Sequence, residues 1–157
     1  MILYGSDDPG AIIFIKNTFL YSQNKIVRVK EFRNIEKLYN RHKPSLLFCG
    51  SVFGKSLDMK LINWAKKKKL FSIGVIDHWT NLKIRFFDGQ NKNLPDLVFV
   101  IDLECKNKLI QYGIPSSKII IFGHSYLKEI SRRNYLEKPF TSNKNILFIS
   151  EPLTMDM

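Results

Sequence analysis

Short apolar runs that alternate with helical segments are the feature that most constrains this fold. Runs such as SLLFC at 45–49 and LFSIGVI at 70–76 are apolar almost throughout, as expected of strands buried on both faces. The expected strands cover 1–4, 25–30, 45–49, 70–76, 96–101, 118–122 and 145–150, and the expected helices cover 9–23, 34–42, 56–69 and 103–112. This alternation predicts an α/β fold with a parallel sheet covered on both faces.

Right-handed crossovers turn such a chain into a Rossmann-like doubly wound sheet. The 157 residues suit a single domain with a sizeable core. We expect this domain to cover 1–143 and interpret 144–157 as the start of a second domain, which contributes only the strand at 145–150. An apolar strand without a partner is an aggregation hazard, so we expect it to pair with this sheet or with another chain.

Capping residues predict several helix ends. Asp8 is placed to cap a helix whose first residue is Pro9, and Ser56 is placed to cap the next clear helix. The lysine run at 66–69 falls at the C-terminal end of that helix, where the helix dipole favours cations. Gly113 is expected to close the helix before it.

The net charge indicates which kinds of partner the chain could bind, and the length of its apolar runs bears on its location in the cell. Twenty-five Lys and Arg against 14 Asp and Glu give a net charge of +11. This charge either attracts anionic partners, such as phosphates or an acidic membrane leaflet, or serves only as a solvated surface that keeps the protein soluble. Nucleic acid is disfavoured because neither zinc-ligand spacing nor an aromatic–basic RNA motif is present. No apolar run is long enough to span a bilayer and no basic leader is visible, so we expect a cytoplasmic protein with peripheral contact to the inner membrane face.

Ligands of open α/β sheets bind outside the carboxyl ends of the strands. Three loops fall there, covering 5–11, 50–55 and 77–85. The first, GSDDPGA, is neither a dinucleotide fingerprint nor a phosphate loop, but its small residues let a ligand approach and its Asp7 could act as a general base on a sugar hydroxyl. The second, GSVFGK, is either an ordinary turn or a small pocket for a phosphate or sugar.

The third loop, DHWTNLKIR, is the most informative. It gathers an acid, an imidazole, an indole, a hydroxyl, an amide and a guanidinium directly after an apolar strand. The indole of Trp79 could stack on a sugar ring, and His78 is the side chain best suited to exchange protons near neutral pH. The same residues also fit an ordinary loop with Trp79 in the core, and both interpretations stay open.

The candidate catalytic residues are therefore Asp7 and His78. The candidate substrate-binding residues share the same three loops: Gly5, Ser6, Asp8, Gly50, Ser51, Asp77, Trp79, Asn81 and Arg85. No metal site is predicted because the three histidines lie far apart without ligand spacing. No cofactor is expected.

These loops and the C-terminal half of the sequence resemble a known family. The segments IDHWTNLKIRF, LPDLVFVID, YGIPSSKIIIFGHSYLKEI and NILFISEP follow one another as in the N-terminal domain of GT-B-fold polysaccharide-biosynthesis proteins, a group related to the nonhydrolysing UDP-N-acetylglucosamine 2-epimerases. The matching positions of the segment that ends the first domain in that family are Gly113, Ile114, Pro115, Lys118, Ile119, Gly123 and His124. The epimerases carry a His-Val-Glu-Ala-Gly segment where this chain has 77–81 without a glutamate, which argues against epimerase chemistry.

The resemblance implies a role in cell-surface polysaccharide synthesis. In that family the second domain holds most of the nucleotide-sugar donor, so this chain would supply the acceptor side and would be incomplete as an enzyme alone. It implies a saccharide or lipid-linked acceptor, and a donor-binding partner chain or a homodimer to complete the cleft. The alternative is a non-enzymatic α/β module that binds an anionic small molecule or a protein. A receiver-type domain is disfavoured, because the strand at 45–49 is followed by no acid.

Overall fold

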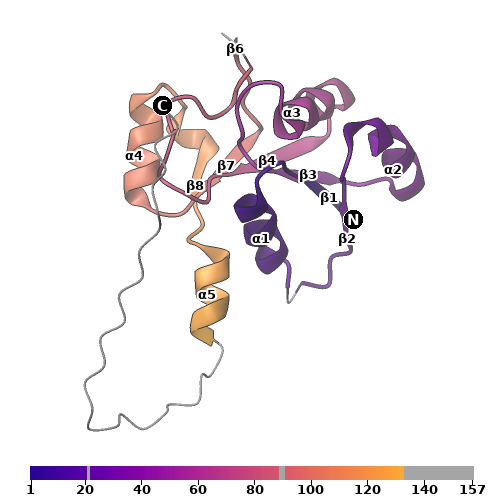
Figure 1. Ribbon diagram of the computed structural model, residues 1–157, viewed down its shortest axis with the longest axis horizontal. Helices are drawn as coiled ribbons and strands as arrows, with labels where there is room; N and C mark the ends of the chain where they lie inside the picture. Colours follow the sequence, from indigo (N-terminus) through magenta and orange to yellow (C-terminus); the bar gives the residue numbers. More distant parts are fainter. Residues whose placement is uncertain (21, 89–90, 133–157) are drawn as a thin grey trace, which may run out of the picture.

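A six-stranded parallel sheet forms the centre of the molecule (Figure 1). The computed structural model describes residues 1–20, 22–88 and 91–132. The strands, in the order β2-β1-β3-β4-β7-β8, are β1 (Ile2–Gly5), β2 (Ile26–Arg28), β3 (Leu46–Cys49), β4 (Phe71–Val75), β7 (Leu97–Val100) and β8 (Ile119–Ile121). Every neighbouring pair in this sheet is parallel. The strand expected at 145–150 and the piece 144–157 lie outside the described residues.

Helices cover both faces of the sheet. They are α1 (Pro9–Thr18), α2 (Ile35–His42), α3 (Leu57–Lys68), α4 (Leu103–Gln111) and α5 (Ser125–Arg132), with short 3₁₀ turns at Phe32–Asn34 and Ser116–Lys118. The crossover through α1 runs from β1 toward β2, whereas later crossovers run the other way along the sheet. Right-handed crossovers therefore place α1 on one face and α2, α3 and α4 on the other. Helix α5 packs against α1, and Figure 1 shows both below the strands with α3 above. The doubly wound Rossmann-like fold predicted from the sequence is confirmed.

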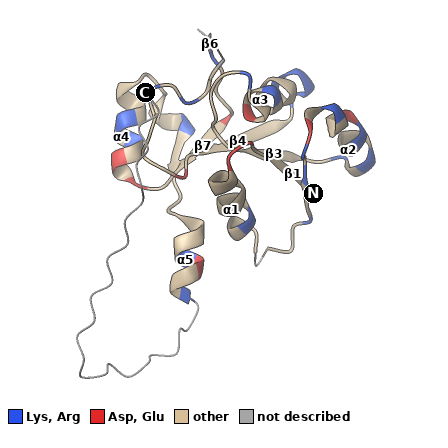
Figure 2. Cartoon of the chain, in the orientation of Figure 1, with Lys and Arg blue, Asp and Glu red and all other residues tan. Residues whose placement is uncertain are grey.

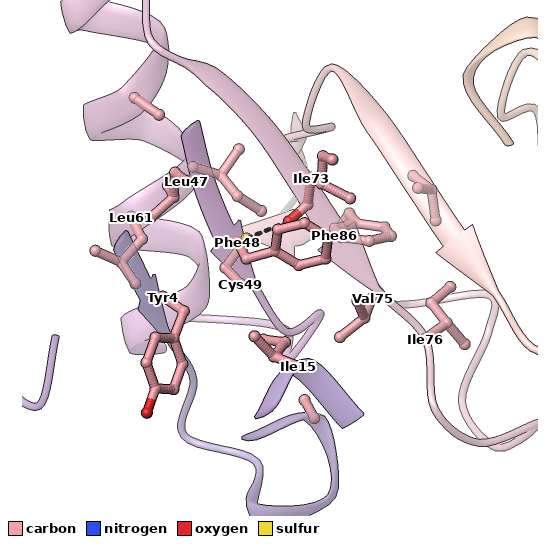
Figure 3. Close-up of a cluster of buried hydrophobic side chains, with 14 of the residues drawn as sticks. Tyr4, Ile15, Leu47, Phe48, Cys49, Leu61, Ile73, Val75, Ile76 and Phe86 are labelled. Atoms are coloured by element: carbon pink, nitrogen blue, oxygen red, sulfur yellow. Dashed lines mark hydrogen bonds between the residues drawn. The ribbon is translucent and has the colours of Figure 1, made fainter. Parts of the chain in front are cut away.

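The core consists of strand residues and the inward faces of the helices. Figure 3 shows part of it, with Phe48 of β3 and Ile73 and Val75 of β4 in one cluster with Ile15 of α1 and Leu61 of α3. The burial of side chains on both faces of β1, β3 and β4 explains why these segments read as continuous apolar runs.

One crossover lacks a regular helix. Between β4 and β7 the chain forms turns over 78–86 and then a small antiparallel pair, β5 (Phe87–Asp88) with β6 (Asn91–Lys92). Phe86 is fully buried at the centre of this segment and lies against Gly74 of β4 (Figure 3). A Cβ at Gly74 would lie 2.7 Å from the Phe86 ring, so the ring can pack against β4 at this position only because residue 74 is a glycine. This contact fixes the loop that carries Arg85.

The predicted capping residues are confirmed. The Asp8 carboxylate accepts a hydrogen bond from the Gly10 backbone N–H at 2.7 Å, with Pro9 at the first helical position. Ser56 caps α3 through the Met59 N–H, and α4 is followed by Gly113 with a positive φ.

The end of one helix and the presence of another differ from expectation. The helix predicted over 9–23 ends at Thr18, because Phe19 leaves the helical path and packs edge-on against Phe48, with ring centroids 5.2 Å apart. Helix α5 was not predicted; Ser125 anchors its start by donating a hydrogen bond to the Phe14 carbonyl oxygen at 2.6 Å.

Candidate functional site

The loops after β1, β3 and β4 meet at the carboxyl edge of the sheet, where the crossover direction reverses between β1 and β3. The four lysines of 66–69 lie at the other end of α3, which returns the chain to the start of β4 (Figure 2). The lysine run therefore takes no part in this edge, and its position at the helix C-terminus agrees with the dipole explanation.

The first loop is held to α3 by carboxylates. The Asp7 carboxylate accepts a hydrogen bond from the Leu57 backbone N–H at 2.6 Å, at the first residue of α3. Asp58, in the same turn, is fully buried and accepts from the Ser6 hydroxyl at 2.7 Å and from the Asp7 N–H at 3.0 Å. Asp7 and Ser6, both predicted site residues, thus serve to hold this loop to the start of α3.

Asp58 is a buried acid that was not among the candidate site residues. Burial raises its pKa to about 6, and the nearby Asp7 carboxylate adds to the increase, although the hydrogen bonds from Asp7 and Ser6 oppose it. Gly50 leaves the room that this contact needs, because a Cβ there would lie 2.3 Å from both the Asp58 carboxylate and the Ser6 hydroxyl. Gly5 is also closely packed, because a Cβ there would lie 2.7 Å from the Val29 carbonyl oxygen.

Arg85 is the central cation of the edge. Its side chain is buried, its Nη1 donates to the Ser51 hydroxyl at 2.7 Å, and its Nε donates to the Thr80 carbonyl oxygen at 3.1 Å. The Asp77 carboxylate lies 3.9 Å from Nη1. The guanidinium is therefore held in one orientation by the loops after β3 and β4.

Asp77 is the least satisfied of these groups. Its Oδ1 is buried and has no hydrogen-bond partner among the described residues, and its other oxygen packs against Gly10 at the start of α1. Burial raises the pKa of the Asp77 carboxyl, the Asp8 carboxylate raises it further, and Arg85 and His124 act in the opposite direction. Sequence reasoning found Asp77, but it assigned His124 no role.

A pocket of about 240 Å³ opens beside Arg85. Its lining comes from all three predicted loops: Asp8, Ser51, Val52, Phe53, Thr80, Asn81 and Arg85. The structure thus brings together four predicted substrate-binding residues, namely Asp8, Ser51, Asn81 and Arg85. It adds three that were not predicted: Val52, Phe53 and Thr80. Phe53 carries the one signal that could have identified it, a large apolar side chain between two glycines in GSVFGK.

His78 and Trp79 lie on the same edge but outside the lining of this pocket. His78 is exposed, and its Nδ1 accepts a hydrogen bond from the Thr80 backbone N–H at 3.2 Å. Trp79 is 45% exposed, and its Nε1 donates to the Asp102 carboxylate at 2.7 Å. The indole is therefore a surface ring tied to the start of α4, and the interpretation with Trp79 in the core is wrong.

Neither a metal cluster nor a membrane-spanning helix is found within the described parts of the chain. Among residues 1–20, 22–88 and 91–132, His, Cys, Asp and Glu form no group of three or more that could hold a metal ion. None of the described helices combines the length and the apolar character that a bilayer crossing requires.

Few known proteins are similar to this chain. The sequence matches no protein-family model and no curated protein. One solved structure, UDP-GlcNAc 2-epimerase from Neisseria meningitidis bound to UDP-GlcNAc, aligns with 84% of this chain and 49% of its own, at 12% sequence identity and a TM-score of 0.49. The chain thus spans about half the length of that structure. The order of the strands places this chain among the Rossmann-like α/β domains.

Proposed function

We propose that this chain is the acceptor-side half of a glycosyltransferase-like protein of cell-surface polysaccharide biosynthesis, and that its carboxyl-edge pocket binds saccharide hydroxyl groups. The pocket offers both kinds of hydrogen-bonding partner that a hydroxyl needs: the guanidinium of Arg85 and the amide of Asn81 donate, and the carboxylate of Asp8 accepts. Its volume of about 240 Å³ is below the roughly 300–1,000 Å³ typical of drug-sized ligands, which favours a small ring.

The helix N-termini at this edge favour a neutral ligand over a free phosphate. Phosphates bind where backbone N–H groups at a helix start are available. Here the Asp8, Asp7 and Asp102 carboxylates already accept from Gly10, Leu57 and Cys105 at the starts of α1, α3 and α4. Internal carboxylates thus occupy these donors and offset the positive ends of the helix dipoles, which supports hydroxyl recognition.

The observation that carries the proposal is the fixed position of Arg85. The side chain is buried at the wall of the pocket and held by Ser51, the Thr80 carbonyl and Asp77. A donor that is already ordered costs little conformational entropy on binding, so it favours recognition of a particular hydroxyl arrangement.

The catalytic roles of His78 and Asp7 are part of the proposal. The Nδ1 of His78 accepts from the Thr80 backbone N–H, so the neutral ring carries its proton on Nε2. To take the proton of an acceptor hydroxyl as a general base, His78 would have to release this hydrogen bond, because Nδ1 is then its unprotonated nitrogen. Transfer itself would need a nucleotide-sugar donor, which we expect a partner chain or a second copy to hold. A neighbouring reading frame that encodes a donor-binding domain would support this division.

Ligand-detected NMR with a panel of monosaccharides and UDP-sugars tests the proposed pocket. We expect at least one hexose or N-acetylhexosamine to bind, and Asn81→Gly to weaken that binding by about tenfold, because one lost hydrogen bond in a pocket costs on the order of 1 kcal/mol or more. Glycine suits the positive φ of residue 81, so the fold is preserved. Arg41→Gln, an exposed position on α2, is the matched control; equal effects of both variants, or no saccharide binding at all, would contradict the proposal.

A binding module without turnover is the second candidate. The observation that favours it is the Asp7 carboxylate, which accepts from Leu57 and so is less available as a general base. Under this alternative His78→Ala leaves saccharide affinity unchanged and no product forms with any donor-binding partner. Product formation that depends on His78 would exclude it.

A further inference from the structure

Two buried polar side-chain atoms have no hydrogen-bond partner among the described residues. They are the Oδ1 of Asp77, in the loop after β4, and the Nδ1 of His124, in the loop after β8. A carboxylate oxygen accepts a hydrogen bond, and an imidazole nitrogen accepts or donates one according to its protonation. A buried polar group without a partner costs stability, so the presence of two such atoms points to a function.

Both side chains lie on the same face of α1. The second oxygen of Asp77, Oδ2, is 2.2 Å from where a Cβ of Gly10 would be, and the His124 ring packs against Phe14 with ring centroids 5.8 Å apart. Positions 10 and 14 are about one helical turn apart, or about 6 Å along the helix axis. The two unpartnered atoms therefore belong to side chains on neighbouring turns of one helix face.

His124 also stands at the start of α5, which is weakly held. Ser125 donates its hydroxyl hydrogen to the Phe14 carbonyl oxygen at 2.6 Å, but the buried residues of α5 are only Ser125 and Glu129, so none of its apolar side chains is buried. Gly123 before it has a φ of +83°, and no heavy atom lies within 4 Å of where its Cβ would be, which leaves room for a hinge. An element with so few buried contacts opens locally at low cost.

We propose that Asp77 and His124 share one proton in a hydrogen bond between Oδ1 and Nδ1, and that this bond is a pH-sensitive latch that holds α5 against α1. The two atoms are not bonded to each other in the structure, so the bond forms when the side chains rotate toward one another. Asp77 also lies 3.9 Å from Arg85, at the wall of the polar pocket. The latch therefore links α5 to the pocket, and it does not depend on the proposed saccharide function.

The charges around the pair set the direction of its pH dependence. Burial raises the pKa of the Asp77 carboxyl, and the Asp8 carboxylate at the start of α1 raises it further. Arg85 and His124 act in the opposite direction, and His124 itself also faces Tyr126 of α5, with ring centroids 6.5 Å apart. A raised pKa means that the folded state keeps a proton that the unfolded state releases. The latch is therefore closed at low pH and opens as the pH rises through the raised pKa.

Hydrogen exchange measured by mass spectrometry tests the latch, with protection corrected for the intrinsic exchange rate at each pH. The amides of α4 in the same samples report any change in global stability. We expect the amides of α5 to lose about tenfold more protection than those of α4 between about pH 5 and about pH 8, the range in which histidine ordinarily changes its charge. Asp77→Asn and His124→Gln remove the shared proton, so each should abolish this excess loss.

His42→Gln is the matched control, because it removes a histidine of α2, on the other face of the sheet, and it should keep the wild-type behaviour. Equal losses in α4 and α5, or an excess loss that survives in both Asp77→Asn and His124→Gln, would overturn the inference. If either variant fails to fold, long-range ¹H–¹⁵N spectra of the three histidine rings of the wild type decide the question. The His124 Nδ1 signal should change over the same pH range as the exchange of α5, and a signal that stays constant there would also refute the latch.

Discussion

Arg85 shows what the sequence can and cannot predict about a single residue: its loop, but not its contacts. Sequence reasoning placed it with Asp77 and Asn81 in one loop, because charged and polar residues follow an apolar strand. Its bond to Ser51 spans 34 positions in the chain, and only the packing of β3 beside β4 creates it. Long-range polar contacts of this kind leave no mark in local sequence patterns, and the same holds for Ser6 and Asp58.

Asp58 gives a prediction at this scale. Its folded pKa of about 6 lies above the ordinary value of 3.8, so the folded state binds more protons than the unfolded state between these values. Stability from this group is therefore greatest below about pH 4 and is lost as pH rises through about 6, by up to roughly 3 kcal/mol. Urea unfolding across that range measures the slope.

Asp58→Asn removes the titrating proton, so the variant should lose stability less steeply than the wild type between about pH 4 and about pH 7. Its absolute stability is expected to be lower, since an amide N–H₂ can no longer accept from the Asp7 N–H. The slope is therefore the readout. Glu104→Gln, at an exposed ion pair, serves as the control and should keep the wild-type slope; an unchanged slope in Asp58→Asn would refute the assignment.

At the scale of elements, the sequence predicts regular structure well where burial and capping agree. The six strands of the parallel sheet lie within or one residue beyond their expected ranges, and the starts of α1 and α3 follow the caps at Asp8 and Ser56. The elements that were not predicted, α5 and the β5–β6 pair, escaped prediction for physical reasons. Helix α5 is short, and its position depends on Ser125 bonding to a carbonyl 111 residues earlier. The β5–β6 pair is brief, although Asp88-Gly89 is a recognised hairpin signal.

The close packing of the Phe86 ring on Gly74 predicts that a larger side chain at position 74 destabilises the fold. In Gly74→Ala the new Cβ would lie 2.7 and 2.9 Å from two ring carbons of Phe86 and 3.0 Å from Pro95. We expect a loss of roughly 1–3 kcal/mol in the free energy of unfolding, as for other overpacked cores. Because Phe86 is next to Arg85, saccharide affinity should fall as well.

A double-mutant cycle with Phe86→Leu checks the cause. If the ring is the obstacle, Gly74→Ala should cost less in the Phe86→Leu background than in the wild type, with the difference measured by chemical denaturation. Additive effects would point instead to strain within β4.

At the scale of the whole molecule, charge is distributed unevenly with respect to the candidate site. The net charge of +11 includes the run at 66–69, which lies at the amino edge of the sheet, away from the pocket (Figure 2). Composition predicted an affinity for anions, but it could not place the basic residues relative to the carboxyl edge, because that depends on the direction of α3.

Peripheral contact with an anionic membrane stays a prediction, and flotation with phosphatidylglycerol-containing vesicles measures it. We expect binding at low ionic strength and its loss at about 1 M salt, where the Debye length falls to about 3 Å. A Lys67→Gln, Lys68→Gln pair should reduce vesicle binding if the run at 66–69 meets the membrane. Binding that persists at high salt would indicate apolar insertion, and absence of binding at low salt would exclude the contact.

The carboxylates that cap α1, α3 and α4 have a consequence for how a sugar would leave the polar pocket. Because the helix starts are already neutralised from within, a sugar there would be held by short-range dipoles that added electrolyte scarcely weakens. Saccharide affinity should therefore stay nearly constant as the ionic strength rises.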